Sequence, residues 1–542
     1  MNGLLLTWLF VFAAQAEPIQ SVYLIMVDRY ANGDPSNDEN ADPSDPTAFH
    51  GGDIQGIIDH LDDIESLGVQ TIWLTPVSKM RTDPIDIHGA FHGYWTDEFG
   101  TMEPRFGTKK DLLALKSALH KRKMNLVIDV VLNHVGPDTS LTHQQPDWFH
   151  TFGDIKDWDD DQQCRTHDVH GLPDLAHEKQ EVADFLIEQS AKWIQEVSPD
   201  GFRIDAVRHI DSNFLSRYVS ELNDITDPDF AFIGEVYEGN PHKVASETEK
   251  TGLTHVFDFP MHFALVDTMC NGGDLRQLAT LLTQDRRYKD PHNLVTFLDN
   301  HDTPRIQTVC NQPGQVEKAV SLLTTLRGIP SFTWGTSVGL EGQTETEARG
   351  DMVFKQTPLR HTIQERLNQR RTIPALHKGG TDILNASKER IAFARVLENQ
   401  AVVSVMGTTD KPTIPSIAGP ATWTPIPSDG MYRWIVTPKT SDGFTAWVKS
   451  IAEDQSKTLP VHLRTHADAS FIGSDPALGA WNPSDAKGKG TLEAHLPAGG
   501  WVAVKTIKQT KSGESIWSPH PNVFIDVNAA SKTGAVVDVP HQ

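Results

Sequence analysis

The sequence predicts an α/β fold: a (β/α)8 barrel with an insert after its third strand, then a small all-β domain and a C-terminal β-sandwich. Three observations predict it. Short apolar runs recur between residues 22 and 334, segments with helical spacing lie between them, and this spacing gives way to short strand-like runs near residue 385. Strands that alternate with helices form a parallel sheet with crossover helices. An open, doubly wound sheet is the alternative, but no glycine-rich phosphate loop follows the first run.

The expected barrel strands are eight apolar runs, the number that a closed barrel of this kind needs. They cover residues 22–28, 69–74, 124–132, 201–206, 231–236, 254–259, 293–299 and 328–334. Between them, residues 53–68, 109–123 and 181–197 carry apolar side chains at three- and four-residue steps, which predicts amphipathic helices. The segment 135–180 follows the third strand and is rich in His, Asp and Trp. An insert of this length in a compact domain usually carries function.

The composition predicts further boundaries after the barrel. We expect the barrel unit to span residues 17–384 and the small β domain to span 385–445, where four short strand-like runs follow one another. Residues 446–458 have the composition of a linker, and residues 459–542 are β-rich again. The last segment is therefore expected to form a separate β-rich unit.

The N-terminal residues have the pattern of a signal peptide. An apolar run from Leu4 to Ala14 is followed by Ala14-Gln15-Ala16, which matches the small-residue cleavage pattern. The run is too short to span a membrane as a helix. We expect a signal peptide at residues 1–16 and a secreted protein; a buried N-terminal element is the alternative.

The charge balance excludes some classes of partner. The net charge is −24, from 72 acidic and 48 basic residues, so there is no basic field to attract nucleic acid or an anionic membrane. A neutral substrate suits this balance, and spare carboxylates can bind divalent cations. We expect a monomer without nucleic-acid or membrane partners.

Cysteines are few for an exported chain. Cys164, Cys270 and Cys310 lie far apart in the sequence and lack metal-ligand spacing. One disulfide at most is possible, and we expect none, because a chain of this length can be stabilised by its core.

The fourth predicted strand carries charges on one face. Residues alternate between the faces of a strand, so Arg203 and Asp205 in GFRIDAVRH share a face, opposite Phe202 and Ile204. In a barrel this face is the lumen, and the C-terminal end of the strands is where barrel active sites lie. Arg203 should keep Asp205 ionised. A purely structural ion pair is the alternative.

Other strand ends carry further ionisable groups. Asp129 and His134 end the third predicted strand, Glu235 ends the fifth, and Asp302 ends the seventh. Burying several carboxylates together is costly, so a scaffold would avoid it. Glycoside hydrolysis needs such an arrangement, because it uses one ionised nucleophile and one acid with a raised pKa. The apolar surroundings of Glu235 should raise its pKa.

Four segments resemble the signature regions of glycoside hydrolase family 13, the alpha-amylase family. They are IDVVLNH (128–134), GFRIDAVRH (201–209), GEV (234–236) and FLDNHD (297–302), and the resemblance extends from about residue 20 to 440. It implies that Asp205 is the nucleophile, Glu235 the general acid/base and Asp302 the residue that stabilises the transition state. It also implies a retaining mechanism, with the carboxyl groups of Asp205 and Glu235 about 5–5.5 Å apart.

The same resemblance implies a set of substrate-binding residues. FHGYW (91–95) and EARGDM (347–352) also resemble family elements, and the family often has Lys where this chain has Arg208. Aromatic faces suit the apolar faces of sugars, although Tyr94 and Trp95 could simply be packing residues of the rim. The implied substrate-binding residues are His92, Tyr94, His134, Arg203, Arg208, His301 and Arg349.

Calcium is the implied metal, at two sites. The loop DRYANGDPSND (28–38) with HGGDIQG (50–56) resembles a calcium loop of cyclodextrin-forming members of the family, and clustered oxygen ligands suit Ca²⁺. A turn-rich loop without metal is the alternative. The implied ligands of this first site are Asn32, Asp34, Asn37, Asp38, Gly51 and Asp53. The second site resembles the family's common calcium position, with Asn133, Asp174 and the backbone carbonyl of His209 as ligands.

The C-terminal segment resembles a starch-binding module, carbohydrate-binding module family 20. The resemblance lies in IGSDPALGAWNP (472–483), LPAGGWVAVKTIK (496–508) and SIWSPHPN (515–522). It implies that Trp481 and Trp517 form a flat stacking surface and that Lys505 and Asn522 bond sugar hydroxyls. Two tryptophans in the core of a small sandwich are the alternative.

Together these resemblances imply a secreted alpha-amylase that hydrolyses internal α-1,4-glucosidic bonds of starch and other α-glucans. A cyclodextrin glucanotransferase or maltogenic amylase-like transglycosylase is the alternative; such enzymes usually carry an extra immunoglobulin-like domain, for which residues 446–458 leave no room. A non-catalytic glycan-binding barrel would have lost a carboxylate, and all three are present. A sugar-isomerase barrel would not need a starch module.

Overall fold

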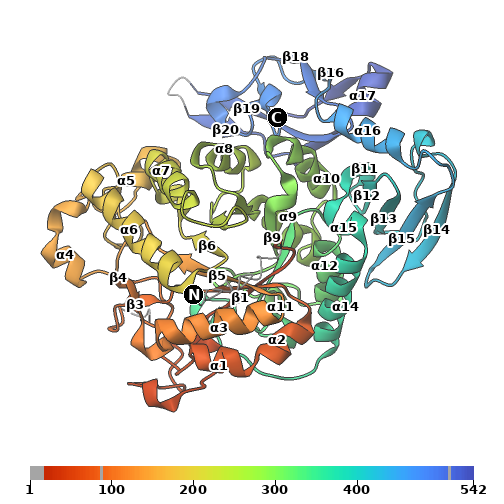
Figure 1. Cartoon of the computed structure of the whole chain (residues 1–542). Helices are drawn as coiled ribbons and strands as arrows, with labels where there is room; N and C mark the ends of the chain where they lie inside the picture. The colour runs from red at the N-terminus through yellow and green to blue at the C-terminus, as the bar shows by residue number, and fades with distance from the viewer. Residues whose placement is uncertain (1–17, 86–88, 511–513, 542) are drawn as a thin grey trace, which may run out of the picture.

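A closed eight-stranded parallel barrel forms the centre of the molecule, surrounded by helices (Figure 1). The computed structural model describes residues 18–85, 89–510 and 514–541. The strand order around the barrel is β1-β10-β9-β8-β7-β6-β5-β2, which confirms all eight expected strands. They are β1 Val22–Ile25, β2 Thr71–Leu74, β5 Asn125–Val130, β6 Gly201–Ile204, β7 Ala231–Gly234, β8 His255–Phe257, β9 Leu294–Phe297 and β10 Ile329–Thr333. The expected signal peptide at residues 1–16 lies outside the described residues.

The helices around the barrel bury the apolar stripes that the sequence predicts. The predicted helix 109–123 forms α3 Lys109–Lys121, which a capping box of Thr108 and Asp111 begins and which buries Leu112, Leu115 and Leu119. Residues 53–68 form two helices that meet at His60. The larger helices are α1 Ile54–Asp59, α2 Leu61–Leu67, α3 Lys109–Lys121, α6 Gln180–Val197, α7 Ser212–Asn223, α8 Pro241–Thr251, α9 Phe259–Cys270, α10 Arg276–Thr283, α12 Gln315–Leu323 and α14 Pro358–Thr372. Among the described residues, none of the helices has the length and apolar character to cross a membrane.

A long excursion separates β5 from α6. It contains two short helices, α4 Ser140–Gln144 and α5 Asp161–Thr166, which lie at one side of the barrel (Figure 1). The excursion returns to the strand end, where the Leu175 amide donates to the Asn133 carbonyl at 2.9 Å. A smaller pair of antiparallel strands, β3 Ser78–Met80 and β4 Thr96–Met102, lies between β2 and α3. Both excursions leave the C-terminal ends of the strands and so border the same rim.

The small β domain is a five-stranded antiparallel sheet, and the segment after it is not a linker. The sheet order is β11-β12-β13-β15-β14, from β11 Gly380–Ser387, β12 Arg390–Leu397, β13 Gln400–Met406, β14 Ala421–Ile426 and β15 Met431–Pro438. Residues 446–458, expected as a linker, mostly form helix α16 Thr445–Asp454. Buried Trp447 explains the difference, because its indole packs on the sheet and donates to Asp382 at 2.7 Å.

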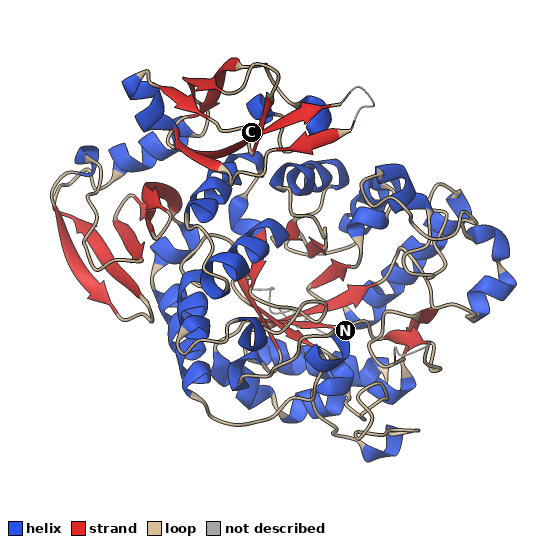
Figure 2. Ribbon diagram, turned by 180° about the vertical axis from the view of Figure 1, so that it is seen from behind, coloured by secondary structure: helices blue, strands red, loops and turns tan. Residues whose placement is uncertain are grey.

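The C-terminal module consists of two sheets that share one core (Figure 2). One sheet contains β16 Thr458–Arg464, β18 Thr491–Pro497 and β22 Val536–Asp538; the other contains β17 Ser470–Gly473, β19 Trp501–Gln509, β20 Ser515–Trp517 and β21 Val523–Asp526. Helix α17 Val527–Thr533 follows β21. The module lies over α8 and α10 of the barrel (Figure 1).

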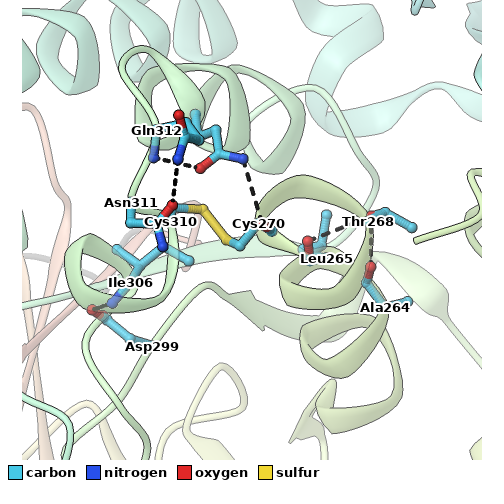
Figure 3. The surroundings of a disulfide bond; sticks show 10 residues. Ala264, Leu265, Thr268, Cys270, Asp299, Ile306, Cys310, Asn311 and Gln312 are labelled. Atoms are coloured by element: carbon cyan, nitrogen blue, oxygen red, sulfur yellow. Dashed lines mark hydrogen bonds between the residues drawn. A yellow bond between two sulfur atoms is a disulfide. The ribbon is translucent and has the colours of Figure 1, made fainter. Parts of the chain in front are cut away.

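One disulfide is present, so the expectation of none was wrong. Cys270 at the end of α9 is bonded to Cys310, which follows the short helix α11 Ile306–Val309 (Figure 3). The two cysteines are 40 residues apart in the sequence, but their Cα atoms are 4.4 Å apart. Sequence spacing gives no sign of this approach, because it results from the packing of two helices. Cys164 is a buried free thiol.

Candidate active site

Asp205 and Glu235 occupy equivalent places on neighbouring strands. Each is the residue directly after its strand, β6 or β7, at the C-terminal rim of the barrel. The Glu235 amide donates to the Ile204 carbonyl at 3.0 Å, which extends the parallel ladder by one residue. Ala206 then takes a left-handed conformation with φ 49° and donates its amide to Glu235 Oε2 at 3.2 Å. A non-glycine residue rarely adopts this conformation, and the turn brings the two carboxyl groups together.

Arg203 is the fully buried cation between these carboxylates. Its Nη1 donates to Asp205 Oδ1 at 2.7 Å and to Asp129 at 2.9–3.0 Å, and its Nη2 lies 2.5 Å from Glu235 Oε1. The ion pair considered as a structural alternative therefore exists, but it is part of a larger cluster. One guanidinium serves three carboxylates, which leaves an excess of buried negative charge.

This charge excess affects the proton affinity of Glu235. Burial raises the pKa of Glu235 to about 7; Arg203 opposes the shift, and the carboxylates of Asp205 and Asp302 add to it. Burial also raises the pKa of Asp129 well above its ordinary value, although Arg203 opposes this. A large fraction of Glu235 is thus protonated at neutral pH, and most of it below neutral pH, so that it can donate a proton. This agrees with the expectation from its apolar surroundings.

Asp302 has the opposite environment. Burial alone would raise its pKa, but His301 and Arg349 outweigh this and lower the pKa below its ordinary value. Oδ1 of Asp302 accepts from Arg349 Nη2 at 2.9 Å, and Oδ2 lies 3.0 Å from His301 Nε2. The side chain remains 36% exposed, so it is open to a ligand while it stays ionised.

Aromatic and histidine side chains surround the carboxylates. Tyr94 stacks on His301 with ring centroids 5.0 Å apart, and its hydroxyl donates to Asp129 Oδ2 at 2.9 Å. His134 Nε2 lies 3.2 Å from the Tyr94 carbonyl oxygen, and His92 Nδ1 accepts from the Tyr94 amide at 3.0 Å. The structure therefore brings four of the expected substrate-binding residues to one rim.

Asp129, Trp73 and Tyr237 were not among the expected site residues, although Asp129 had been noted at the end of its strand. Trp73 at the end of β2 donates its indole N–H to Asp129 at 3.2 Å, and the Arg203 guanidinium lies 5.0 Å from its ring centre. Tyr237, two residues after Glu235, is 48% exposed. Partial burial raises the pKa of its hydroxyl, and the charges of Asp302 and Glu235 raise it further. These residues lie at or shortly after the C-terminal ends of predicted strands, and this position is the sequence feature that could have identified Asp129, Trp73 and Tyr237.

Arg208 lies apart from the carboxylate cluster. Its guanidinium donates to the carbonyl of Trp158 in the excursion between β5 and α6. His209 also contacts this excursion, since its Nδ1 lies 2.8 Å from the Cys164 carbonyl oxygen. The turn after β6 therefore holds the excursion against the barrel, and Arg208 contacts none of the three expected catalytic carboxylates among the described hydrogen bonds and ion pairs.

The expected first calcium loop brings most of its oxygen ligands together. Asn32 donates to Asp38 Oδ2 at 2.7 Å, and Asn37 lies 3.5 Å from Asp53 Oδ2. Gly51, at φ +95°, fits against this pair: a Cβ there would lie 2.8 Å from Asp38 Oδ1. That Oδ1 is buried and has no hydrogen-bond partner among the described residues. Asp34 and Asp53 differ: the carboxylate of Asp34 accepts from Ser36, and that of Asp53 accepts from the amides of Gly33, Asp34 and Gly56.

The expected second calcium site is also rich in buried oxygen atoms. Asn133 and Asp174 are fully buried, and Oδ1 of each lacks a hydrogen-bond partner within the described part of the chain. Oδ2 of Asp174 lies 2.6 Å from His150 Nδ1. Leaving buried polar atoms unpaired is costly, so the donor set fits a cation that prefers oxygen. Within the described ranges, no three His, Cys, Asp or Glu side chains lie together in a way that could hold a metal ion, so Asp34, Asp38 and Asp53 of the first site do not form such a group.

The residues expected to bind starch lie on two strands and in two loops of the C-terminal module. Lys505 and Trp517 come from β19 and β20, and Trp517 is 41% exposed. Trp481 and Asn522 lie in loops and line a cleft between the module and the barrel. Neither tryptophan belongs to the core cluster of the module as described, which argues against the alternative that both are core residues.

The fold and this rim define a class of protein. A parallel barrel whose strand ends bring several buried carboxyl groups together, one of them with a raised pKa, fits the architecture of a glycoside hydrolase. Residues 24–375 match the family model described as "Alpha amylase, catalytic domain". The chain belongs to the alpha-amylase family, glycoside hydrolase family 13, which confirms the resemblance of its four motifs.

Individual relatives agree with the family. The chain is 34% identical over 384 residues to a beta/alpha-amylase of Paenibacillus polymyxa, which is 66% of this chain but only 31% of that protein. The crystal structure of an alpha-amylase from Geobacillus thermoleovorans with acarbose is 29% identical, with a TM-score of 0.71, and the match covers 78% of this chain and 99% of that one. The cyclomaltodextrin glucanotransferase CldA, with a three-domain ABC distribution, shares the fold at 22% identity and a TM-score of 0.67, over 91% of this chain and 100% of that one.

Proposed function

We propose that this chain is a secreted, retaining alpha-amylase that hydrolyses internal α-1,4-glucosidic bonds of starch and related α-glucans. The observation that carries the proposal is the contact of Asp205 and Glu235 with one guanidinium, that of Arg203. A shared guanidinium keeps the two carboxyl groups close, as a retaining mechanism requires. The disulfide between Cys270 and Cys310 supports export, because such bonds persist mainly in oxidising compartments.

In this proposal the carboxyl groups divide the chemistry. Asp205 attacks the anomeric carbon and forms a glycosyl-enzyme, while Glu235 donates its proton to the departing glucosidic oxygen. Glu235 then accepts a proton from water, and the resulting attack frees the sugar from Asp205 with retained configuration. Asp302, held by His301 and Arg349, stays charged and stabilises the positive charge that develops on the sugar ring.

The remaining assignments belong to the same proposal. His92, Tyr94 and His134 bind the sugar beside the scissile bond, and Arg349 and Arg203 position Asp302 and the two reacting carboxyl groups. Residues of the 28–53 loop would hold one calcium ion, and Asn133 and Asp174 would hold a second, which would link the excursion to the barrel. Each would serve as a structural ion there, and no proton transfer depends on it.

Transglycosylation by the same residues is the competing outcome. The missing room for an additional domain does not exclude it, because a glucanotransferase with three domains shares this fold. Both reactions pass through a glycosyl-enzyme and differ in whether water or a sugar hydroxyl attacks it. The proposed hydrolysis therefore has to be separated from transfer by its products.

The test incubates the protein with soluble starch and with cyclodextrins and resolves linear and cyclic products over time. Linear maltooligosaccharides that appear first in the α-anomeric form support the proposal; mainly cyclic products, or β-anomers, would refute it. The Asp205→Asn variant should lose activity on the order of 10⁴-fold, since it lacks the nucleophile. Full activity of this variant would remove Asp205 from its proposed role.

A further inference from the structure

A cleft lies between the C-terminal module and the barrel, outside the carboxylate rim. Its volume is about 410 Å³, and both parts of the chain line it. Gly239, Pro241 and Phe263 line it from the barrel, and Trp481, Asn522 and Phe524 line it from the module. The cleft thus places residues expected to bind starch opposite an aromatic side chain of α9.

Polar contacts around the cleft hold the module in place. Asn240 Nδ2 donates to the Ala480 carbonyl at 2.8 Å, directly before Trp481 in the sequence. His242 Nε2 lies 2.9 Å from the Ser474 carbonyl oxygen. Arg287 pairs at 2.8 Å with Asp475, whose side chain is 5% exposed. Together with the two hydrogen bonds, this half-buried ion pair indicates that the module and the barrel face each other in a defined orientation.

The module turns its proposed sugar-binding face toward this cleft. Val502 and Val504 of β19 lie in the module core, so Ala503 and Lys505 must point to the opposite face. Ala503 lines the cleft, and Phe524, its partner in the neighbouring strand, does so too. The starch-binding face is therefore not directed away from the catalytic barrel.

An aromatic path joins the cleft to Glu235. Tyr237 is two residues beyond Glu235, and its ring centre lies 6.0 Å from that of Phe263. Gly239 packs on the Phe263 ring, since a Cβ there would lie 3.5 Å from it. Both side chains are exposed to solvent, Tyr237 to 48% and Phe263 to 40%. The loop 235–240 thus runs from the proposed acid to the module past two exposed rings.

Tyr237 and Phe263 are exposed next to each other, although large apolar side chains are usually buried. Adjacent exposed apolar groups often mark a binding surface. Glucose rings have apolar faces that stack on aromatic rings, and their hydroxyl groups bond to amides such as that of Asn522. An α-glucan that leaves the carboxylate rim along Tyr237 meets Phe263 next and then Trp481. A sugar ring stacked on these side chains removes their apolar faces from water, which is favourable.

We propose that Phe263 and Trp481 form a composite glucan-binding site between the barrel and the module, continuous through Tyr237 with the cleft that holds Glu235. This rests on the proposed hydrolysis of α-glucans and deepens it. A long glucan chain bound across Asp205 and Glu235 extends into the composite site. The module then acts as part of the substrate cleft for dissolved chains, in addition to any role on granules.

The test compares kcat/KM on long soluble amylose with kcat/KM on maltotetraose, which is too short to span both places. Phe263→Ala and Trp481→Ala should each lower the ratio of kcat/KM on amylose to kcat/KM on maltotetraose about three- to tenfold. This is the loss expected for one stacking contact. The double variant should lose little more than either single variant, because both rings hold the same sugar. Tyr432→Ala, an exposed aromatic of the small β domain, is the matched control and should leave the ratio unchanged.

The outcomes separate the composite site from the proposed function. If the wild-type protein hydrolyses both substrates and neither variant changes the ratio, the composite site is wrong while the hydrolase proposal stands. If the wild-type protein hydrolyses neither, both are wrong. Losses that multiply in the double variant would mean two separate sites and would also overturn the proposal.

A second measurement does not depend on the folding of those two variants. In the full-length Glu235→Gln protein, amide hydrogen exchange is followed with maltoheptaose or with maltose. Slower exchange in residues 237–240 and 480–482 together, with maltoheptaose only, supports the composite site. Protection of residues 480–482 alone would overturn it, because the module would then bind sugar without the barrel.

Discussion

Arg203 shows at the scale of single residues how a buried cation can serve catalysis. Asp129, Asp205 and Glu235 all contact its guanidinium, so no carboxylate of the cluster has a cation to itself. Trp73 and Tyr94 donate hydrogen bonds to Asp129, which leaves the other two carboxyl groups to face the rim. Burial is the main reason that the pKa of Glu235 is raised; the carboxylates of Asp205 and Asp302 add to the shift, and Arg203 opposes it only in part.

The raised pKa of Glu235 predicts the pH dependence of activity. Burial raises this pKa to about 7, so the acid is protonated below that pH and loses its proton as the pH rises through it. We expect kcat/KM on a short maltooligosaccharide to fall tenfold per pH unit above about 7, because only the protonated form can assist the leaving group. A pH profile between 4 and 10 measures it.

The Glu235→Gln variant is the control for this assignment. Its residual activity should lack the fall near pH 7, since the amide does not titrate. A fall at the same pH in both proteins would mean that another group causes it. Activity of the wild-type protein that continues to rise beyond pH 8 would contradict the role of Glu235 as the acid.

Two elements far apart in the barrel sequence are joined by the disulfide. Cys270 ends α9 and Cys310 follows α11, so the bond ties together two helices that follow β8 and β9 (Figure 3). Closing this loop restricts the unfolded chain and thereby stabilises the folded one.

Reduction should therefore destabilise the protein. The Cys270→Ser/Cys310→Ser variant is expected to lose about 3–4 kcal/mol in the free energy of unfolding, the value for a loop of this size. Thermal unfolding with and without a reductant measures it. The Cys164→Ser variant is the control, because its free thiol forms no bond to lose, and reductant should lower its Tm as much as it lowers that of the wild type. A Tm that reductant leaves unchanged in the wild-type protein would contradict the prediction.

The proposed calcium sites make a prediction for the loops around the rim. Calcium at about 100 times its Kd should add about 3 kcal/mol for each site, because it binds only the folded state. A chelator should thus lower Tm, and added calcium, but not magnesium, should restore it. The Asp38→Ala and Asn133→Ala variants should each lose part of this response. An unchanged Tm under chelation would refute both sites.

At the scale of the whole molecule, the module is docked on the barrel and is not a freely tethered unit. The Trp501 amide donates to Thr283 of α10 at 2.8 Å, and Arg286 donates to the Ala498 carbonyl at 3.2 Å. An experiment that removes the whole module would therefore also expose barrel surface. Single substitutions in the full chain test the starch-binding role more directly.

Granule adsorption is the property expected to depend on Trp517. The Trp517→Ala variant should adsorb to starch granules about three- to tenfold more weakly, because it loses one exposed stacking ring. Depletion of the protein from solution by granules measures this. Ile516→Ala is the matched control, since Ile516 is also exposed but points to the other side of the same strand. Equal adsorption of both variants would refute the role of Trp517.

The sequence by itself determined the barrel and the composition of the rim. Apolar runs located all eight strands, and Asp205 and Glu235 could be placed because strand ends in a parallel barrel share one rim. These features depend on local periodicity and on a topology with few alternatives. The raised pKa of Glu235 could also be expected, because its apolar neighbours lie next to it in the chain.

Only the tertiary structure decided the features that depend on distant segments. The disulfide, the helix in place of a linker and the contact of Arg208 with Trp158 each join parts of the chain that no local pattern relates. The orientation of the module is the largest of these. The sequence identified Trp481, but whether it faces solvent or the barrel depends on how two separately formed cores pack, and that packing is set by contacts such as Asn240 with Ala480.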